Sequence, residues 1–153
     1  MLFRSGLEPP TVAVFAGTGS EERSLLSRAR DLGVEGSVRF LGWRSDLPAI
    51  MSASDWFILP RPEHPMEGFG LAVVEAQLAG LRLLVSRGIP DDPLLPTASF
   101  RRLALSDGPE YWARAALELL NDPAPPRIAA LAALKDSAMN MDRALQELLA
   151  LHE

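Results

Sequence analysis

The amino-acid sequence predicts an α/β fold in which helices flank a parallel β-sheet and the C-terminus is helical. Up to Leu105, short runs of β-favouring residues alternate with helical patterns, which is the sequence form of a parallel sheet. From Pro109 onward the pattern is helical. A length of 153 residues suits about one domain. We therefore expect a single domain over residues 1–153, with residues 1–10, which contain one glycine and two prolines, as an irregular leader.

The expected strands are short runs of apolar and β-favouring residues. They are Thr11–Phe15, Ser37–Leu41, Asp55–Leu59, Leu81–Ser86 and Phe100–Leu105. The first run is mostly apolar, which is typical of a strand covered on both faces.

The expected helices alternate with these strands and then fill the C-terminal region. They are Glu21–Leu32, a short helix ending near Ala53, Leu71–Ala79, Glu110–Asn121, and one or two helices after a proline-rich break at Asp122–Pro126. Gly33 suits the stop of the first helix, and Asp46 suits the N-cap of the second, with Pro48 in its first turn. Apolar stripes predict the inward faces. These stripes are Leu25, Leu26 and Ala29 in the first helix, and Ile128, Leu131, Leu134, Leu145 and Leu148 in the last ones.

Composition excludes several classes of function. Hydrophobic residues make up 48% of the chain, but no apolar run is long enough to span a bilayer. The chain has no cysteine, which excludes disulfides and thiolate metal sites, and no secretion-signal layout, so we expect a cytoplasmic protein. A net charge of −5 without a cluster of Lys or Arg argues against nucleic-acid binding. Two histidines, His64 and His152, are too few for a typical metal centre, and we expect His64 to be an exposed loop residue.

The most informative segment carries two acids on either side of a glycine turn. Glu67 and Glu75 flank Gly68-Phe69-Gly70, which opens a short apolar helix. The glycines allow close approach of the backbone to a ligand, and a helix start offers unpaired N–H groups to an anion such as a diphosphate. Glu75 is expected on the inward stripe of this helix, where it needs a polar partner. The pattern predicts a nucleotide-sugar site.

Each motif lies where an expected strand ends. The four segments are Gly17 with Gly19, Gly42–Arg44, Pro60–Gly70 and Ser86–Asp91. Because ligands of parallel α/β sheets bind at the carboxyl ends of the strands, we expect these four loops to converge on one edge.

The order of these motifs resembles a known family. Along the chain stand G-T-G, L-G-V-x-x-x-V-R-F-L-G-W, A-S-D-W-F-I-L-P, M-E-G-F-G-L-A-V-V-E-A-Q-L-A-G-L and S-R-G-I-P-D-D. Together they resemble the C-terminal, donor-binding domain of group 1 (family 4) retaining glycosyltransferases of the GT-B type. The wording is most similar to members that build capsular polysaccharide and exopolysaccharide. The resemblance runs from about Val12 to the C-terminus and implies a Rossmann-like sheet that forms the C-terminal half of a GT-B fold.

The resemblance also implies a role for each site residue. Glu67 would be the catalytic acid, in contact with the donor sugar near the reacting carbon. The backbone amides of Gly68, Phe69 and Gly70 would hold the diphosphate, and Glu75 the ribose hydroxyls. The remaining donor-binding positions are Gly17 and Gly19, which let the chain pass close to the ligand, and Gly42, Trp43 and Arg44, whose backbone meets the base. The donor would be a UDP-sugar or GDP-sugar, with no metal and no further cofactor.

Two features of the family are missing from this sequence. One is a segment with Gly-Arg-Leu and Lys-Gly that precedes the first strand and clamps the diphosphate. The other is the N-terminal domain that binds the acceptor. Because loss of the cationic clamp removes charge stabilisation, we expect weak donor binding and no sugar transfer by the isolated chain. We further expect that it needs the acceptor domain or a partner chain, and that its uncovered apolar surface favours self-association.

Three interpretations remain open at this stage. The first is transfer of a sugar, with retention, from a nucleotide-diphosphate sugar to a polysaccharide or similar acceptor. The second is a non-catalytic nucleotide-sugar-binding module, or a fragment, that needs a partner acceptor domain. The third is half of a sugar-nucleotide epimerase, although the wording of the E-G-F-G and E-A-Q motifs fits transferases better.

Overall fold

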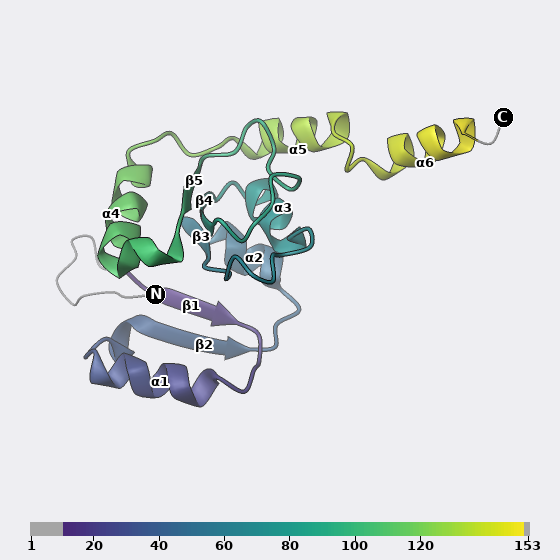
Figure 1. Cartoon of the computed structure of the whole chain (residues 1–153). Coiled ribbons are helices and arrows are strands. Elements are labelled where there is room, and N and C mark those ends of the chain that lie inside the picture. The colour runs from purple at the N-terminus through teal and green to yellow at the C-terminus, as the bar shows by residue number, and fades with distance from the viewer. Residues whose placement is uncertain (1–10, 152–153) are drawn as a thin grey trace. The chain divides into compact units, whose positions relative to one another are not determined.

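The computed structural model describes residues 11–151 and divides the chain into two compact units, Met1–Ala49 and Ile50–Glu153 (Figure 1). Helix α2 (Leu47–Ser52) joins the two along the chain. The leader expected over residues 1–10 lies outside the described residues.

The first unit contains a pair of parallel strands. Strand β1 (Ala13–Ala16) pairs with β2 (Val38–Gly42), and helix α1 (Glu22–Asp31) and the short helix η1 (Glu35–Ser37) connect them (Figure 1). The rings of Phe15 and Phe40, which are partners in the register, stack with centroids 4.8 Å apart. This aromatic pair fixes the register of the two strands, since a slip of one residue would separate the rings.

Two expectations about the interior of this unit are wrong. The first strand is not covered on both faces, because Ala13 is buried while Val14 is 44% exposed. Leu25, expected on the inner stripe of its helix, is exposed, whereas Ala29 is buried and Leu26 is half-buried. Side chains of a strand alternate between faces, so one helix over a two-stranded sheet buries only every second residue.

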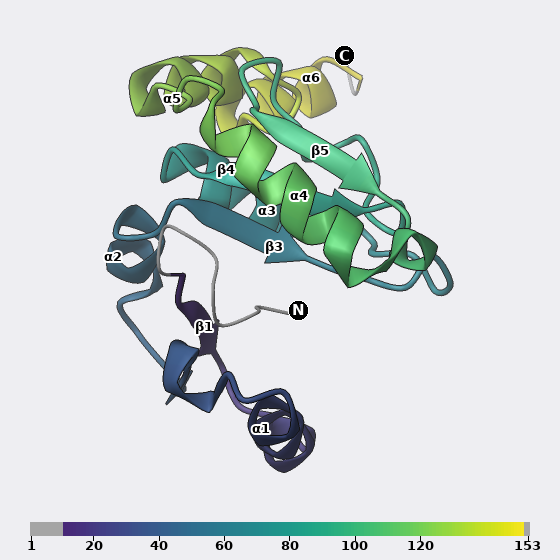
Figure 2. The same ribbon diagram turned by 90° about the vertical axis from the view of Figure 1, so that its left-hand side faces the viewer.

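The second unit contains a three-stranded parallel sheet. Its order is β3 (Trp56–Leu59), β4 (Arg82–Ser86) and β5 (Phe100–Leu103), with β4 in the centre. Helices lie on both sides, with α3 (Leu71–Leu78) on one face and α4 (Gly108–Leu120), which follows the short helix η2 (Leu105–Asp107), on the other (Figure 2). The expected parallel α/β sheet flanked by helices is confirmed, with strand ends within two residues of the expected ones.

Burial along β4 shows how this sheet is covered. Leu83 and Val85 pack into one apolar cluster with Val73 and other residues of α3, whereas Leu84 packs into a second cluster with residues of α4. The three side chains are at most 1% exposed. An apolar run whose alternate side chains are buried on opposite faces is the pattern of a central strand in a doubly covered parallel sheet.

The C-terminus is helical as expected, but its leucines do not face inward. Helix α5 (Arg127–Asp136) buries Ala130. The small methyl group of this residue allows the backbone of α5 to lie close to α3, which it contacts. Every side chain of α6 (Met141–Ala150) is exposed. The expected inward stripe is therefore wrong for its exposed members, which are Ile128, Leu131, Leu145 and Leu148. Only Leu134 is half-buried.

No helix within residues 11–151 reaches the length and apolarity needed to cross a membrane.

Candidate functional site

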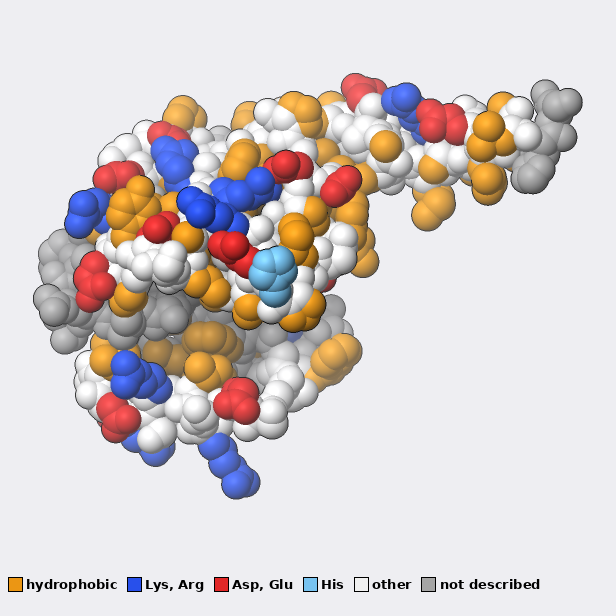
Figure 3. Space-filling view, in the orientation of Figure 1, with side chains coloured by type: hydrophobic (Ala, Val, Ile, Leu, Met, Phe, Trp, Pro, Cys, Tyr) orange, Lys and Arg blue, Asp and Glu red, His pale blue; other side chains and the backbone are white. Residues whose placement is uncertain are grey.

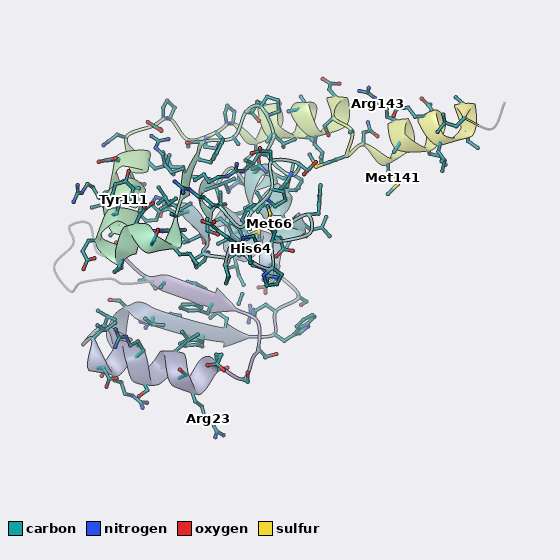
Figure 4. All side chains as sticks on the ribbon, viewed as in Figure 1. Arg23, His64, Met66, Tyr111, Met141 and Arg143 are labelled. Carbon is teal, nitrogen blue, oxygen red and sulfur yellow. The ribbon has the colours of Figure 1, made fainter. Side chains whose placement is uncertain are left out.

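The segment between β3 and α3 forms a loop at the carboxyl end of the sheet. His64 and Met66 protrude from it into solvent, and the exposure of His64 agrees with expectation (Figure 4). The Glu67 side chain is 32% exposed, and its Oε2 lies 3.5 Å from the Arg61 Nε. Acidic and basic side chains lie on one side of the histidine on this face, and hydrophobic side chains lie next to it on other sides (Figure 3). A carboxylate that is only partly screened and stands beside a cation is available to a polar ligand.

The loop after β4 lies directly against this loop. The hydroxyl of Ser86 donates a hydrogen bond to the Arg61 carbonyl at 2.5 Å, and the Glu67 amide donates one to the Gly88 carbonyl at 2.9 Å. Two of the four strand-exit segments singled out from the sequence therefore meet within the second unit. The geometry places Glu67 at the carboxyl edge of β3 and β4, where parallel sheets bind their ligands.

Gly70 sets the entry into α3. It caps the helix with φ 86° and ψ 56°, a left-handed conformation that glycine adopts without strain, and its carbonyl accepts the Val73 amide at 2.8 Å. The space around it is limited, because a Cβ there would lie 3.4 Å from a Val73 methyl and 3.5 Å from the Glu67 Cγ. Gly70 thus permits the turn that places Glu67 beside the helix start, whose first N–H groups suit an anion.

The second acid of the motif lies on the opposite side of α3 from the one expected. Glu75 is exposed, together with Leu71 one turn earlier, and the buried side of the helix is formed by Val73, Ala76 and Gln77. Within residues 11–151 the Glu75 side chain makes no hydrogen bond or ion pair. The prediction that Glu75 faces inward is wrong. Because the side chain is exposed, it also does not need a polar partner inside the fold.

The buried polar residue of this helix is Gln77, which the sequence reasoning missed. Its Nε2 donates to the carbonyls of Val73 at 2.9 Å and Pro93 at 2.8 Å, and its Oε1 accepts the Leu95 amide at 2.8 Å. Gln77 thereby ties the loop before β5 to the first turn of α3. The signal was present in the sequence, since Val73, Ala76 and Gln77 share one face at helical spacing.

The sequence-predicted residues of the first unit form a second group. The Gly17 amide donates to the Gly42 carbonyl at 2.7 Å, and both glycines have positive φ, 130° and 62°. Among the described residues, and apart from the adjacent residues of the chain, no atom lies within 4 Å of where a side chain of Gly17, Gly19 or Gly42 would begin, so the backbone of these turns is open. Trp43 is 84% exposed. Exposed glycine turns of this kind leave main-chain groups accessible to a ligand.

Arg44 is engaged by its neighbour along the chain. Its Nε and Nη2 donate to the two carboxylate oxygens of Asp46 at 2.8 and 2.6 Å. This hydrogen bonding lowers the pKa of the Asp46 carboxyl below its ordinary value. The expected helix does begin directly after Asp46.

Residues 2–136 match the model of a protein family described as Glycosyl transferases, group 1. The chain belongs to this family. The matched residues include the loop between β3 and α3 and the start of α3 described above.

Curated relatives of this group 1 glycosyltransferase chain include two bacterial enzymes. The chain is 37% identical over 86 residues to UDP-Gal:α-D-GlcNAc-diphosphoundecaprenol α-1,3-galactosyltransferase of Escherichia coli. The aligned residues cover 56% of this chain and 21% of that protein. It is 34% identical over 71 residues to the lipopolysaccharide core biosynthesis glycosyltransferase LpsE of Rhizobium meliloti, covering 46% and 20% respectively. The chain thus spans about a fifth of the length of these relatives.

Among solved structures, HepE of Anabaena in complex with UDP has a similar fold. The TM-score is 0.71 at 22% sequence identity, over 93% of this chain and 41% of HepE. HepE in complex with UDP-glucose gives the same values. At this identity the likeness establishes the fold, and it confirms the GT-B type architecture expected from the sequence.

The charges around the site of this group 1 glycosyltransferase include three arginines at the strand ends. Arg102 is held by Asp91, with its Nη1 2.6 Å from Oδ1, and its Nη2 donates to the Pro90 carbonyl at 3.2 Å. Arg61 faces Glu67, as described. The Arg87 side chain, which is exposed, has no hydrogen bond or ion pair within residues 11–151. Of these three arginines, Arg61 and Arg87 are therefore the ones less committed to other partners.

Proposed function

We propose that this chain is the donor-binding part of a glycosyltransferase that moves a sugar from a nucleotide-diphosphate sugar to a polysaccharide or similar acceptor, with retention. One observation carries the proposal. The family motif places Glu67 beside a left-handed glycine turn that opens α3, at the carboxyl edge of the sheet. The partly exposed carboxylate of Glu67 can accept hydrogen bonds from sugar hydroxyls, and the first N–H groups of α3 can hold a diphosphate.

Each site residue has a role in this proposal. Glu67 contacts the donor sugar near the reacting carbon, and the amides of Gly68, Phe69 and Gly70 hold the diphosphate. Glu75 binds the ribose hydroxyls, which its exposure and lack of a partner permit. In the first unit, Gly17 and Gly19 let the donor approach the backbone, and Gly42, Trp43 and Arg44 meet the base.

Positive charge for the diphosphate is assigned to Arg61 and Arg87. Arg61 and Arg87 follow β3 and β4, at the same edge as the α3 start. Since departing phosphate charge must be stabilised for transfer, these side chains are the natural candidates within the second unit. Replacing each by alanine should weaken UDP binding, and replacing Arg114, which is exposed on α4, should not.

The names of related proteins favour a UDP-type donor. The galactosyltransferase relative is named for UDP-Gal, and HepE has been solved with UDP and UDP-glucose. LpsE is named for lipopolysaccharide core biosynthesis, which supports a surface polysaccharide as the acceptor. A GDP-type donor remains the alternative from the sequence. Titration calorimetry with UDP, UDP-glucose, GDP and GDP-mannose separates the two. Tighter binding of the GDP pair would overturn the UDP assignment.

The second candidate function is a binding module without activity of its own. It is the alternative that the sequence left open, in which an acceptor domain or a partner chain would complete the enzyme. An assay of acceptor-dependent UDP release decides between the two. Binding of UDP-glucose without turnover supports the module, whereas many turnovers by the chain alone support the complete enzyme. Lack of binding by every nucleotide sugar would refute both.

We also propose the cytoplasmic location expected from the sequence. Fractionation of cells that express the chain tests this location, and recovery of the chain outside the cytoplasmic fraction would contradict it.

A further inference from the structure

We propose that Ser86 and Gly88 are positioning residues that hold Glu67 in place, and that they do so through contacts between the loops after β3 and β4. This inference depends on the proposed function only because it takes Glu67 to contact the donor sugar. We call these contacts the loop latch. It consists of Ser86 and Gly88 on one side, and of Arg61, Pro62 and Glu67 on the other.

The first contact is a partly buried hydrogen bond. Ser86 is the last residue of β4, and none of its surface is exposed. Its hydroxyl donates to the Arg61 carbonyl at 2.5 Å, across 25 residues of sequence. Without this donor, the carbonyl would lose its protein partner in a partly buried place, where the cost is at most the roughly 1–3 kcal/mol of a fully buried polar group. The strand end therefore fixes the beginning of the loop that carries Glu67.

The second contact is a close approach of two backbones. A Cβ at position 88 would overlap the Pro62 carbonyl oxygen, and it would lie 2.8 Å from the Pro62 carbonyl carbon and 2.9 Å from the Arg61 oxygen. Real Cβ atoms essentially never come closer than 3.0 Å to another heavy atom. Since the neighbours are backbone atoms, no change of side-chain rotamer can relieve the overlap. Gly88 is thus required by space.

The third contact connects the latch to the proposed catalytic residue. The Glu67 amide donates to the Gly88 carbonyl at 2.9 Å, and the Glu67 carboxylate lies 3.5 Å from the Arg61 Nε. Gly88 therefore touches Pro62 on one side of the loop and Glu67 on the other. Any side chain at position 88 must push Pro62 away and thereby shift the segment that ends at Glu67.

A shift of this kind affects the chemistry of the site as well as stability. Misplacing a catalytic group by about 1 Å can cost on the order of 100-fold in rate. For binding alone, loss of one hydrogen bond to a charged acceptor corresponds to about tenfold or more in affinity. Because Glu67 meets the sugar and not the nucleotide, the loss should fall on UDP-glucose and largely spare UDP.

The test compares the full-length chain with the variants Ser86→Ala and Gly88→Ala. Two matched controls make the same substitutions elsewhere. Ser54→Ala removes a serine hydroxyl that donates to the Ile50 carbonyl at 2.9 Å, and Gly36→Ala adds a methyl group in open space. Ser86→Ala introduces no overlap, so it keeps the proposal testable where Gly88→Ala does not fold.

Two readouts are needed, and one of them is independent of ligand. Hydrogen exchange by NMR should show faster exchange of the Glu67 amide in the Ser86 and Gly88 variants, with amides of α4 unchanged. Calorimetry should show a loss of about tenfold in UDP-glucose affinity and a smaller loss for UDP. Unchanged Glu67 exchange, or equal losses for UDP and UDP-glucose, would overturn the latch as a positioning device. If the natural chain binds neither ligand, the proposed function is wrong, and the exchange of the Glu67 amide alone judges the latch.

Discussion

Replacement of Gln77 by leucine should destabilise the second unit strongly, although leucine is similar in size. The amide is 2% exposed and makes three hydrogen bonds, to Val73, Pro93 and Leu95. The Val73 carbonyl lies within α3 and can keep a helical partner. The Pro93 carbonyl and the Leu95 amide would each lose their side-chain partner in a buried region, and two such groups cost about 2–5 kcal/mol together.

The expected loss is large enough to measure by thermal unfolding. A change of about 2–5 kcal/mol corresponds to a decrease in Tm of roughly 5–15 °C for a chain of this size. The matched control is Gln146→Leu, because Gln146 is exposed on α6. Calorimetric or circular dichroism melts of the three proteins provide the comparison. If Gln77→Leu melted at the same temperature as Gln146→Leu, the three hydrogen bonds would contribute nothing and the reasoning would be refuted.

A second replacement at the same position separates hydrogen bonding from packing. Gln77→Glu keeps an acceptor for the Leu95 amide but directs a carboxylate at the carbonyl of Pro93. Burial and these neighbours should raise the pKa of the new carboxyl in the folded chain above its unfolded value. Stability is then highest at pH values below the unfolded pKa, and it falls as the pH rises through the folded pKa. Gln77→Leu should lack this pH dependence, and equal pH profiles for both variants would contradict the geometry.

Three further predictions concern exposed residues. Glu75→Gln should weaken UDP binding about tenfold or more without a change in Tm, as judged by calorimetry and thermal melts, whereas Glu118→Gln should change neither. The apolar side chains exposed on α6 should promote self-association. The double variant Leu145→Glu and Leu148→Glu should therefore scatter less light than the natural chain at the same concentration. A monodisperse natural chain would contradict this prediction. The pKa of Asp46 in the folded chain is lowered from the ordinary carboxyl value of 3.8. The ion pair of Asp46 with Arg44 should therefore stabilise the first unit at pH values above 3.8, and this stabilisation should be lost as the pH falls through the lowered pKa of the folded chain. Asp46→Asn should remove that part of the pH dependence, and an unchanged acid melting profile would show that the pair contributes nothing.

The order of strands and helices could be predicted from the sequence because most strands are short runs of apolar and β-favouring residues close to a glycine, a proline or a charged residue. The expected strand at Leu81–Ser86 begins one residue later in the structure, at Arg82. The sheet edge that holds Glu67 also followed from the pattern, since parallel strands place their exits on one side. These features depend on local composition and on the general rules of parallel sheets.

The features that sequence reasoning missed depend on neighbours that are distant along the chain. Helix α3 has only eight residues, so an apolar stripe through Leu71 and Glu75 was as acceptable as the one through Val73 and Gln77. The correct choice depends on the loop at Pro93 and Leu95, which the helix pattern does not contain. The requirement for Gly88 is of the same kind, because the atoms that exclude a side chain there belong to Arg61 and Pro62.

The double cover of β4 separates what can vary in this protein from what cannot. Leu83 and Val85 are buried against the α3 layer and Leu84 against the α4 layer, so a substitution at any of them would disturb one of the two layers. The loops that leave the same sheet carry exposed side chains such as His64 and Arg87, whose replacement leaves the layers intact. On the proposed function, donor preference could therefore be changed, in evolution or in a laboratory library, by diversifying those exposed loop positions while the strand between the two helical layers is kept unchanged.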